Sequence, residues 1–380
     1  MHALQFNQTV GTYLIYMIPL FKVFMPESVF GPLQATLSSG YIGEGPRVVE
    51  FEQALSTRLG APHALTLNSA TSGLQLALRL AGVGPGDEVI TTPLTCAATN
   101  WPILAQGASP VWADIDENSA NIDPLTIEPL ITRHTKAIMV MHWGGNPADL
   151  DQIWAIAKRH NLKVIEDAAH AFGSTYQGKP VGTQSDFGVF SFQAIKHMTT
   201  VDGGLLMSYC ESDHARGKLL RWYGIDRDKP RTDFRCEDDI AEWGWKFHMN
   251  DVAATIGLEQ LKHVDANLQK HQENAAFYTR ELQGVKNVTV LPAPADRTSA
   301  SWLYTLKVRD RDRFIRVMGE RGIATSRVHE RNDKHTAVAA YRRPLPQLDR
   351  FIQEMVCIPV GWWVTEDDRR SIVESIQKGW

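Results

Sequence analysis

The sequence predicts an α/β protein, with a mixed, mostly parallel sheet sandwiched by helices and a smaller α+β C-terminal domain. Short β-type runs alternate with amphipathic helical segments between about residues 46 and 210, a pattern typical of a parallel sheet covered on both faces. Beyond that point the alternation fades into a long helical tract. The 380 residues, 43% of them hydrophobic, are enough for one large domain and one smaller domain.

The individual elements follow from hydrophobic periodicity and from start and stop signals. Helical segments are expected over residues 46–60, 69–82, 149–161, about 250–283 and 311–323. Strands are expected over residues 63–68, 87–93, 108–116, 135–143, 162–167, 187–192, 203–208 and 301–310. We predict an N-terminal extension over 1–16, a large domain over 17–255, and a linking helix with the small domain over 256–380.

Composition excludes several classes of function. A formal charge of −4 provides no basic stripe for nucleic acid. The apolar run at 13–25 is interrupted by Pro19 and Lys22 and is too short to span a bilayer, so we expect no membrane association. Four scattered cysteines without CxxC spacing favour a reducing, cytoplasmic location, and the thirteen histidines show no metal-ligand spacing.

Two segments of the predicted large domain could bind an anionic ligand with a cationic ring. The strand "VIED" ends in Asp167, and ligands of open α/β sheets bind beyond the carboxyl ends of strands. A helix N-cap is the alternative role for this aspartate. In "LNSATSGLQLAL", small and hydroxyl residues precede a helix whose free N–H groups favour a phosphate, although ordinary capping by Ser69 or Thr71 is also consistent.

The stretch "FSFQAIKHMTTVDGG" places one lysine, Lys196, after an apolar strand. A lone loop lysine is usually a solvated surface residue. Desolvation would instead lower its pKa and make it a nucleophile toward a carbonyl. Ser191 lies five residues earlier and could bind a phosphate oxygen. Together, the amine, the acid and the phosphate site are what pyridoxal 5′-phosphate (PLP) requires.

These segments resemble the DegT/StrS family of PLP-dependent sugar aminotransferases. The resemblance is dense over about residues 17–275, including "HWGGNPADLDQIWAIAKRHNLKVIEDAAHAFGSTYQGKPVG" and "GWKFHMNDVAATIGLEQL", and looser beyond. It implies fold type I of the PLP-dependent transferases. It also implies conversion of a nucleotide-linked keto-sugar, expected to be a 4-keto-6-deoxyhexose, into an amino sugar with glutamate as the donor.

The resemblance also implies roles for particular residues. Lys196 matches the lysine that carries PLP, and Asp167 matches the acid paired with the pyridine nitrogen. His170 falls near the phenolic oxygen of the ring. The phosphate site is implied for Ala70, Thr71 and Ser191. The segment around Lys246 and His248 matches one that reaches the phosphate of a neighbouring subunit, which implies a homodimer with shared active sites.

The chain departs from the family pattern in two places. Many members carry a ring-stacking aromatic residue where this chain has Cys96, and stacking is either lost or taken over by a group such as Trp101. The segment "SRVHERNDKHTAV" differs from the usual His-Tyr-Pro-like stretch, so His329, Arg331 and His335 are only candidates for the sugar-nucleotide pocket.

Alternative functions remain open at this point. A dehydratase branch of the family carries histidine in place of the lysine, and His197 is adjacent to Lys196; a non-catalytic sensor is the other alternative. Separately, the basic and aromatic segment at 221–231 is either a solvated loop or a site where Arg221 or Arg227 binds the substrate diphosphate.

Overall fold

The computed structural model describes residues 17–230 and 239–380; the predicted extension over residues 1–16 lies outside the described residues. A seven-stranded sheet forms the centre of the molecule, in the order β1-β9-β8-β5-β4-β2-β3. The strands from β8 to β3 pair in parallel, and β9 alone runs against its neighbours β8 and β1. The predicted mixed, mostly parallel sheet is therefore confirmed. Its strands are β1 (Ala64–Leu67), β2 (Glu88–Thr91), β3 (Ser109–Trp112), β4 (Thr135–Met141), β5 (Lys163–Asp167), β8 (Phe187–Ser191) and β9 (Gly204–Ser208).

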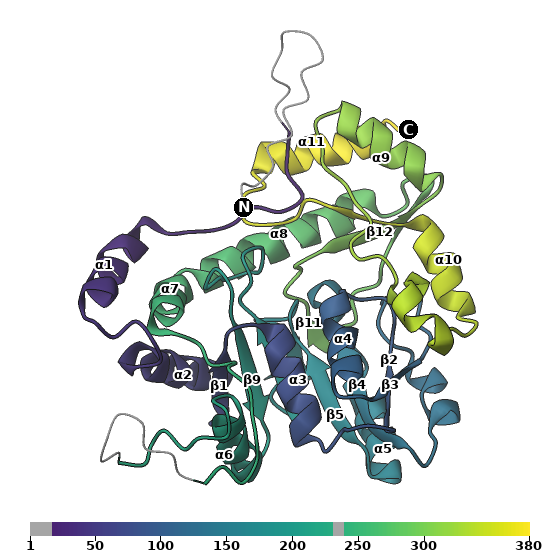
Figure 1. Ribbon diagram of the computed structural model, residues 1–380. Coiled ribbons are helices and arrows are strands. Elements are labelled where there is room, and N and C mark those ends of the chain that lie inside the picture. Colours follow the sequence, from purple (N-terminus) through teal and green to yellow (C-terminus); the bar gives the residue numbers. More distant parts are fainter. Residues whose placement is uncertain (1–16, 231–238) are drawn as a thin grey trace.

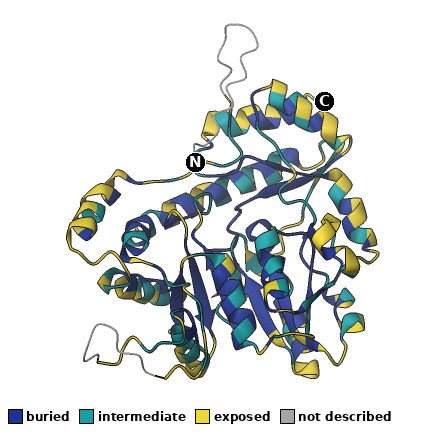
Figure 2. Cartoon of the chain, viewed as in Figure 1, coloured by how far each residue is buried: buried dark blue, intermediate teal, exposed yellow. Residues whose placement is uncertain are grey.

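Helices cover both faces of this sheet (Figure 1). One apolar core lies between the sheet and α3 (Ala70–Leu80), α4 (Ala97–Ala105) and α6 (Glu211–Leu220). The other lies between the sheet and α2 (Pro46–Leu59), α5 (Leu150–His160) and α7 (Asp251–Leu261). Figure 2 shows the strands buried between helices whose outer faces are exposed, which is why the strands read as continuous apolar runs.

The C-terminal part forms a second, smaller layer with its own core. Its antiparallel sheet has the order β10-β12-β13 and is covered by α8 (Val264–Leu282), α9 (Arg311–Glu320) and α11 (Glu366–Gln377). The helical tract expected over 250–283 is two helices, because α7 ends before Lys262 and α8 begins at Val264. The remaining elements are α1 (Phe30–Ser38), α10 (Pro346–Glu354), β6 (Thr175–Tyr176), β7 (Lys179–Pro180), β10 (Val288–Val290), β11 (Arg297–Thr298), β12 (Tyr304–Val308) and β13 (Met355–Ile358).

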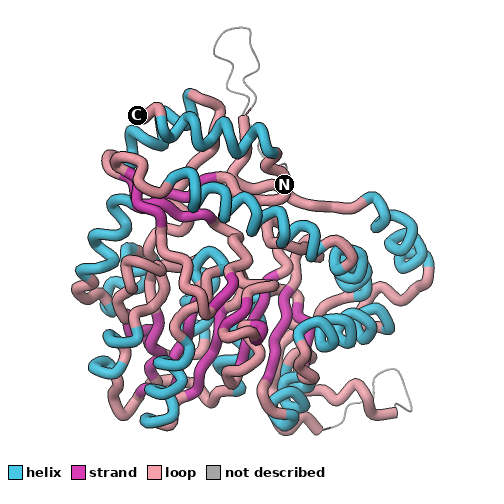
Figure 3. Tube along the Cα trace, turned by 180° about the vertical axis from the view of Figure 1, so that it is seen from behind, coloured by secondary structure: helices cyan, strands magenta, loops and turns pink. Residues whose placement is uncertain are grey.

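The N-terminal segment connects the two layers. Ile18 pairs with Ile323 of the small layer, and Trp363 donates from Nε1 to the carbonyl of Pro19 at 2.8 Å. The chain then runs from α11 across to α1, a path visible from both sides of the molecule (Figures 1 and 3). Phe21 in this segment stacks on Trp302 with ring centroids 5.0 Å apart, which brings the N-terminal segment close to the carboxyl edge of the central sheet.

Candidate functional site

Asp167 occupies the end of β5 and is 3% exposed. Its Oδ2 accepts a hydrogen bond from Thr99 Oγ1 at 2.7 Å, and its Oδ1 accepts one from the N–H of Ala169 at 3.0 Å. No helix begins after it, so the N-cap alternative is wrong, although the bond to Ala169 does fix a turn. Burial raises the pKa of this carboxyl, while the hydrogen bonds and the nearby Lys196 lower it. Within the described chain no cation forms an ion pair with it, so the site has room for a positively charged ligand group.

Lys196 lies on the loop between β8 and β9, and its ε-amino group is desolvated. Burial lowers the pKa of this amine to about 8, and the charges of Asp167 and Cys96 oppose the shift. The solvated-lysine alternative is therefore wrong. An amine with this pKa is partly neutral near pH 7, the state in which it attacks carbonyls and accepts protons.

His170 and His329 meet at the same place from different parts of the chain. Their rings stack with centroids 5.5 Å apart, and both rings stack on Trp302, His170 at 3.8 Å. Burial lowers the pKa of His170 well below its usual value and that of His329 to about 4, with the charge of Lys196 as a further cause. Both rings are therefore neutral. His170 Nδ1 and His329 Nε2 are buried without a hydrogen-bond partner in the described structure, which leaves both polar atoms to a ligand.

The start of α3 and the end of β8 lie on either side of Gly204. This glycine pairs with Leu67 on β1 and with Ser191 on β8. A Cβ at Gly204 would lie 2.5 Å from the backbone nitrogen of Ala70, so only glycine permits this close approach.

Ser69 caps α3 by accepting from the N–H of Ser72 at 3.1 Å, as the capping alternative requires. The N–H groups of Ala70 and Thr71 have no acceptor within the helix, since they belong to its first turn. Capping and anion binding are therefore compatible here. Ala70, Thr71 and Ser191 surround a place that suits a phosphate group.

The other predicted residues have different surroundings. Lys246 lies beside Trp222, with Nζ 5.5 Å from the ring centroid, and its carbonyl accepts from Asn68 Nδ2 at 3.3 Å. Arg331 forms ion pairs with Asp333 and Asp349, so its guanidinium is already engaged. His335 is exposed and lies edge-on to Trp101 with centroids 5.8 Å apart. Of the three C-terminal candidates, only His329 reaches the cluster around Lys196.

Three functional contacts were missed by reasoning from the sequence. Trp302 lies at the start of an expected strand and carried no signal of its own. Thr99 follows the "TPLT" stretch by one helical turn, and its spacing from Thr95 is the only hint. Asn332 is 2% exposed and bonds to Asn100 Nδ2 at 2.9 Å and to the carbonyl of Thr95 at 2.7 Å, which ties the segment carrying His329 to α4.

His197 does not face this site. Its Nε2–H donates to the carbonyl of Ala300 at 2.9 Å, and its ring packs edge-on against His271 at 4.8 Å. Cys96 is the N-cap residue of α4 and is exposed, and Trp101 packs with His335. The aromatic ring that contacts Lys196 is therefore Trp302, from the small layer.

Arg221 does not bind substrate in the arrangement expected for the 221–231 segment. It is 2% exposed and donates to Glu44 Oε1 at 2.7 Å, to Glu52 Oε1 at 2.6 Å and to the carbonyl of Thr66 at 2.9 Å. Arg227 pairs with the same Glu44 at 2.5 Å. Both halves of the earlier interpretation are wrong for Arg221, because it is neither solvated nor free to bind a diphosphate.

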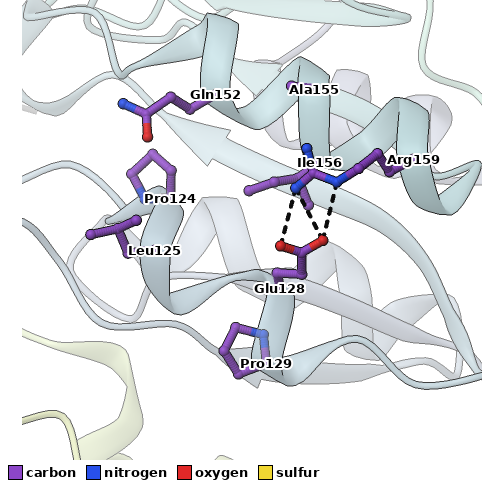
Figure 4. A pocket seen from close by; sticks show the side chains of 8 residues that line it. All are labelled: Pro124, Leu125, Glu128, Pro129, Gln152, Ala155, Ile156 and Arg159. Atoms are coloured by element: carbon purple, nitrogen blue, oxygen red, sulfur yellow. Dashed lines mark hydrogen bonds and ion pairs between the residues drawn. The ribbon is translucent and has the colours of Figure 1, made fainter.

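A separate groove of about 510 Å³ lies between α5 and the turns after β3 (Figure 4). It is crossed by the ion pair of Arg159 with Glu128 at 3.0 Å, and none of the predicted site residues lines it. The described residues also contain no cluster of three or more potential metal ligands and no helix long and apolar enough to cross a membrane.

Known proteins share this architecture. The profile of the DegT/DnrJ/EryC1/StrS aminotransferase family matches residues 26–377. Over 288 residues the chain is 37% identical to a UDP-4-amino-4-deoxy-L-arabinose–oxoglutarate aminotransferase of Shewanella sediminis, covering 75% of this chain and 74% of that protein. The crystal structure of the sugar aminotransferase CalS13 from Micromonospora echinospora is similar with a TM-score of 0.93 and 45% identity, covering 96% of this chain and 100% of that one. Spr1654 from Streptococcus pneumoniae, solved in PLP and PMP forms, is similar with a TM-score of 0.89 and 28% identity, covering 96% and 97% of the two chains.

Proposed function

The chain belongs to the DegT/DnrJ/EryC1/StrS aminotransferase family, and we propose that it transfers an amino group from glutamate to a nucleotide-linked keto-sugar. A 4-keto-6-deoxyhexose is the sugar we propose, and the product is then the corresponding amino sugar. The observation that carries the proposal is the pairing of a desolvated lysine amine with a buried, cation-free carboxylate at the carboxyl edge of the sheet.

The residues around this pair fit PLP, the cofactor of the family. The start of α3 with Ser191 would hold the phosphate, and the glycine at 204 leaves the required space. Asp167 has no cationic partner and would bind the protonated pyridine nitrogen. His170 Nδ1 has no partner and would reach a polar atom of the ring. Bound there, PLP would supply an electron sink for the carbanion that forms when the donor loses its α-proton.

The protein's own groups then have defined tasks. Lys196 would hold the cofactor covalently at rest and, once released, would move a proton at its Nζ as general base and acid. Asp167 would act electrostatically by keeping the ring nitrogen charged. The neutral rings of His170 and His329 would leave the charge balance between Lys196 and Asp167 undisturbed, because both imidazoles are buried with lowered pKa values.

We further propose a cytoplasmic homodimer with shared active sites. Large apolar side chains are exposed on α1, on the loop after it and on α2, including Phe30 at 65%, Tyr41 at 67% and Val49 at 65%. Such a concentration is unusual for a surface that remains in water. The segment with Lys246 and His248 would contact the phosphate of the other subunit, and His248 Nδ1 is buried without a partner in the described single chain. The described cysteines are all free thiols, in agreement with a reducing compartment.

The proposal is tested in two stages with the purified chain. Added PLP should produce an absorbance band at the violet edge of the visible spectrum, and borohydride should bleach it and fix the cofactor on Lys196. Glutamate should then convert the bound cofactor to its amine form, and a panel of keto-sugar nucleotides should convert it back. Failure to take up PLP would overturn the proposal, whereas conversion by glutamate without recovery by any sugar nucleotide would overturn the substrate class alone.

A further inference from the structure

Trp302 makes the closest aromatic contact with the Lys196 amine. The Nζ atom lies 3.6 Å from the centroid of the indole ring. This is well within the range in which the negative face of an aromatic ring attracts a cation, and tryptophan is the strongest of the aromatic residues in this respect. The ring is only 2% exposed, so water competes weakly for the ammonium.

The indole is held in one orientation by contacts from several elements. Its Nε1–H donates to the carbonyl of Ile195 at 2.8 Å, one residue before the lysine. His170 stacks on it with centroids 3.8 Å apart, and Phe21 from the N-terminal segment stacks on it with centroids 5.0 Å apart. The ring therefore cannot turn away from Lys196 without breaking a hydrogen bond and two stacking contacts.

The backbone before Trp302 is fixed as well. His197 donates to the carbonyl of Ala300 at 2.9 Å, and His271 donates from Nδ1–H to the carbonyl of Ser301 at 3.0 Å. The N–H of Ala300 in turn donates to Ser174 Oγ at 3.0 Å in the large domain. These bonds give the two adjacent buried histidines a role, since they place a segment of the small layer against the lysine loop.

We propose that Trp302 is a positioning residue that holds the free ε-ammonium of Lys196 against its indole face whenever the lysine is not bonded to the cofactor. The inference rests on the proposed function, in which Lys196 must leave the cofactor, carry a proton and return. A side chain with four rotatable bonds would otherwise be free to leave the site during that interval. The indole keeps the amine next to the reacting atoms and favours its protonated form.

The remaining ionisable groups near Lys196 come from four other places. Asp167 at the end of β5 and Cys96 at the start of α4 favour the ammonium, whereas His170, His329 and His197 disfavour it when they are charged. Burial keeps the three histidines neutral, so they contribute little. The balance at Lys196 is therefore set by desolvation on one side and by Asp167 and the indole face on the other.

The matched variants Trp302→Phe and Trp302→Leu test the proposal. Phenylalanine keeps an aromatic face, whereas leucine leaves a comparable space without one. The full chain freed of bound cofactor is labelled with trace acetic anhydride across a pH series, and acetylation of Lys196 is quantified by mass spectrometry. We expect the pKa of Lys196 to fall from Trp to Phe to Leu, by about one unit in total. Trp154→Phe is the control, because Trp154 donates to Ser185 elsewhere in the large domain and should leave the pKa unchanged.

Several results would overturn the proposal. An unchanged or higher pKa in Trp302→Leu than in Trp302→Phe would show that the ring face does not act on the amine. If the leucine variant does not fold, equality between the wild type and Trp302→Phe would have the same meaning. These outcomes are independent of the proposed function, whose failure would show as absence of PLP uptake by the wild-type chain.

Discussion

Two groups of buried charges lie near the carboxyl edge of the central sheet, and their hydrogen bonding differs. Around Arg221, each charge has a partner: the guanidinium donates to Glu44, to Glu52 and to a backbone carbonyl, and Glu52 also accepts from the N–H of Thr66 at 2.8 Å. Around Lys196, the carboxylate of Asp167 has only neutral donors, and the amine has an indole face instead of a counter-ion.

The contrast separates a structural cluster from a functional one. A completed set of ion pairs leaves no site for a ligand, and its charges serve to join α2, β1 and the end of α6. An incomplete set is costly in the empty protein, and a ligand that supplies the missing charges recovers that cost on binding. Perturbed pKa values that follow from desolvation therefore mark the functional cluster.

The strongest test of this contrast is Lys196→Ala. Without the amine there is no covalent attachment and no proton carrier, so we expect transamination to slow by at least about a thousandfold. The rate of glutamate-dependent conversion of bound cofactor measures the effect. Lys163→Ala is the control, because Lys163 begins the strand that Asp167 ends and pairs with Asp186 at the surface. An undiminished rate in Lys196→Ala would contradict the assignment.

Replacement of Arg221 tests the structural cluster. Arg221→Ala should lower the free energy of unfolding by about 3 kcal/mol, because two largely buried carboxylates lose their partner. The exposed pair of Arg58 with Asp265 offers a comparison, and Arg58→Ala should cost at most about 1 kcal/mol. Urea denaturation measures both values. The Michaelis constant for the sugar nucleotide should be unchanged in folded Arg221→Ala, and an increase would restore the diphosphate role that the geometry opposes.

Asp167→Asn tests the other charge of the functional cluster. The amide keeps the shape and a hydrogen bond with Thr99 but cannot stabilise a protonated ring nitrogen. We expect the rate of the glutamate half-reaction to fall by about a hundredfold. Asp265→Asn, on an exposed pair, should leave the rate unaffected. A normal rate in Asp167→Asn would show that the buried carboxylate belongs to the structural class.

The smallest expected effect concerns pH. The pKa of Lys196 is lowered to about 8 in the folded chain, below its value in the unfolded chain, so folding with the amine charged is unfavourable at neutral pH. This penalty is full below pH 8 and disappears as pH rises toward the unfolded pKa. The cofactor-free Lys196→Met variant should therefore be more stable than the wild type near pH 7, and the difference should shrink at about pH 9.5.

Denaturation at the two pH values, without cofactor, measures this difference. A gap that stays constant with pH would show that the effect comes from packing and not from the charge. The rate of covalent PLP uptake by the wild type should rise through pH 8 and level off, because the neutral amine is the reactive form.

Much of the sheet and of the lysine site followed from local patterns. Seven strands and the helices α2, α3, α5 and α9 coincide with expected segments, because hydrophobic period and terminal glycines act over a few residues. Asp167 and Lys196 were found for the same reason, since each follows a buried-type strand directly. The short strand β13 and helix α4, which contains Pro102, lacked such patterns and were not expected.

The sequence by itself determined the alternating α/β order, the family resemblance and the residues at the strand ends, because these depend on neighbours along the chain. Only the tertiary structure decided that Arg221 is fully paired, that His197 turns away from the site and that Trp302 lies 3.6 Å from the lysine amine. Each of these depends on segments separated by more than a hundred residues, and no local period records which distant side chains meet.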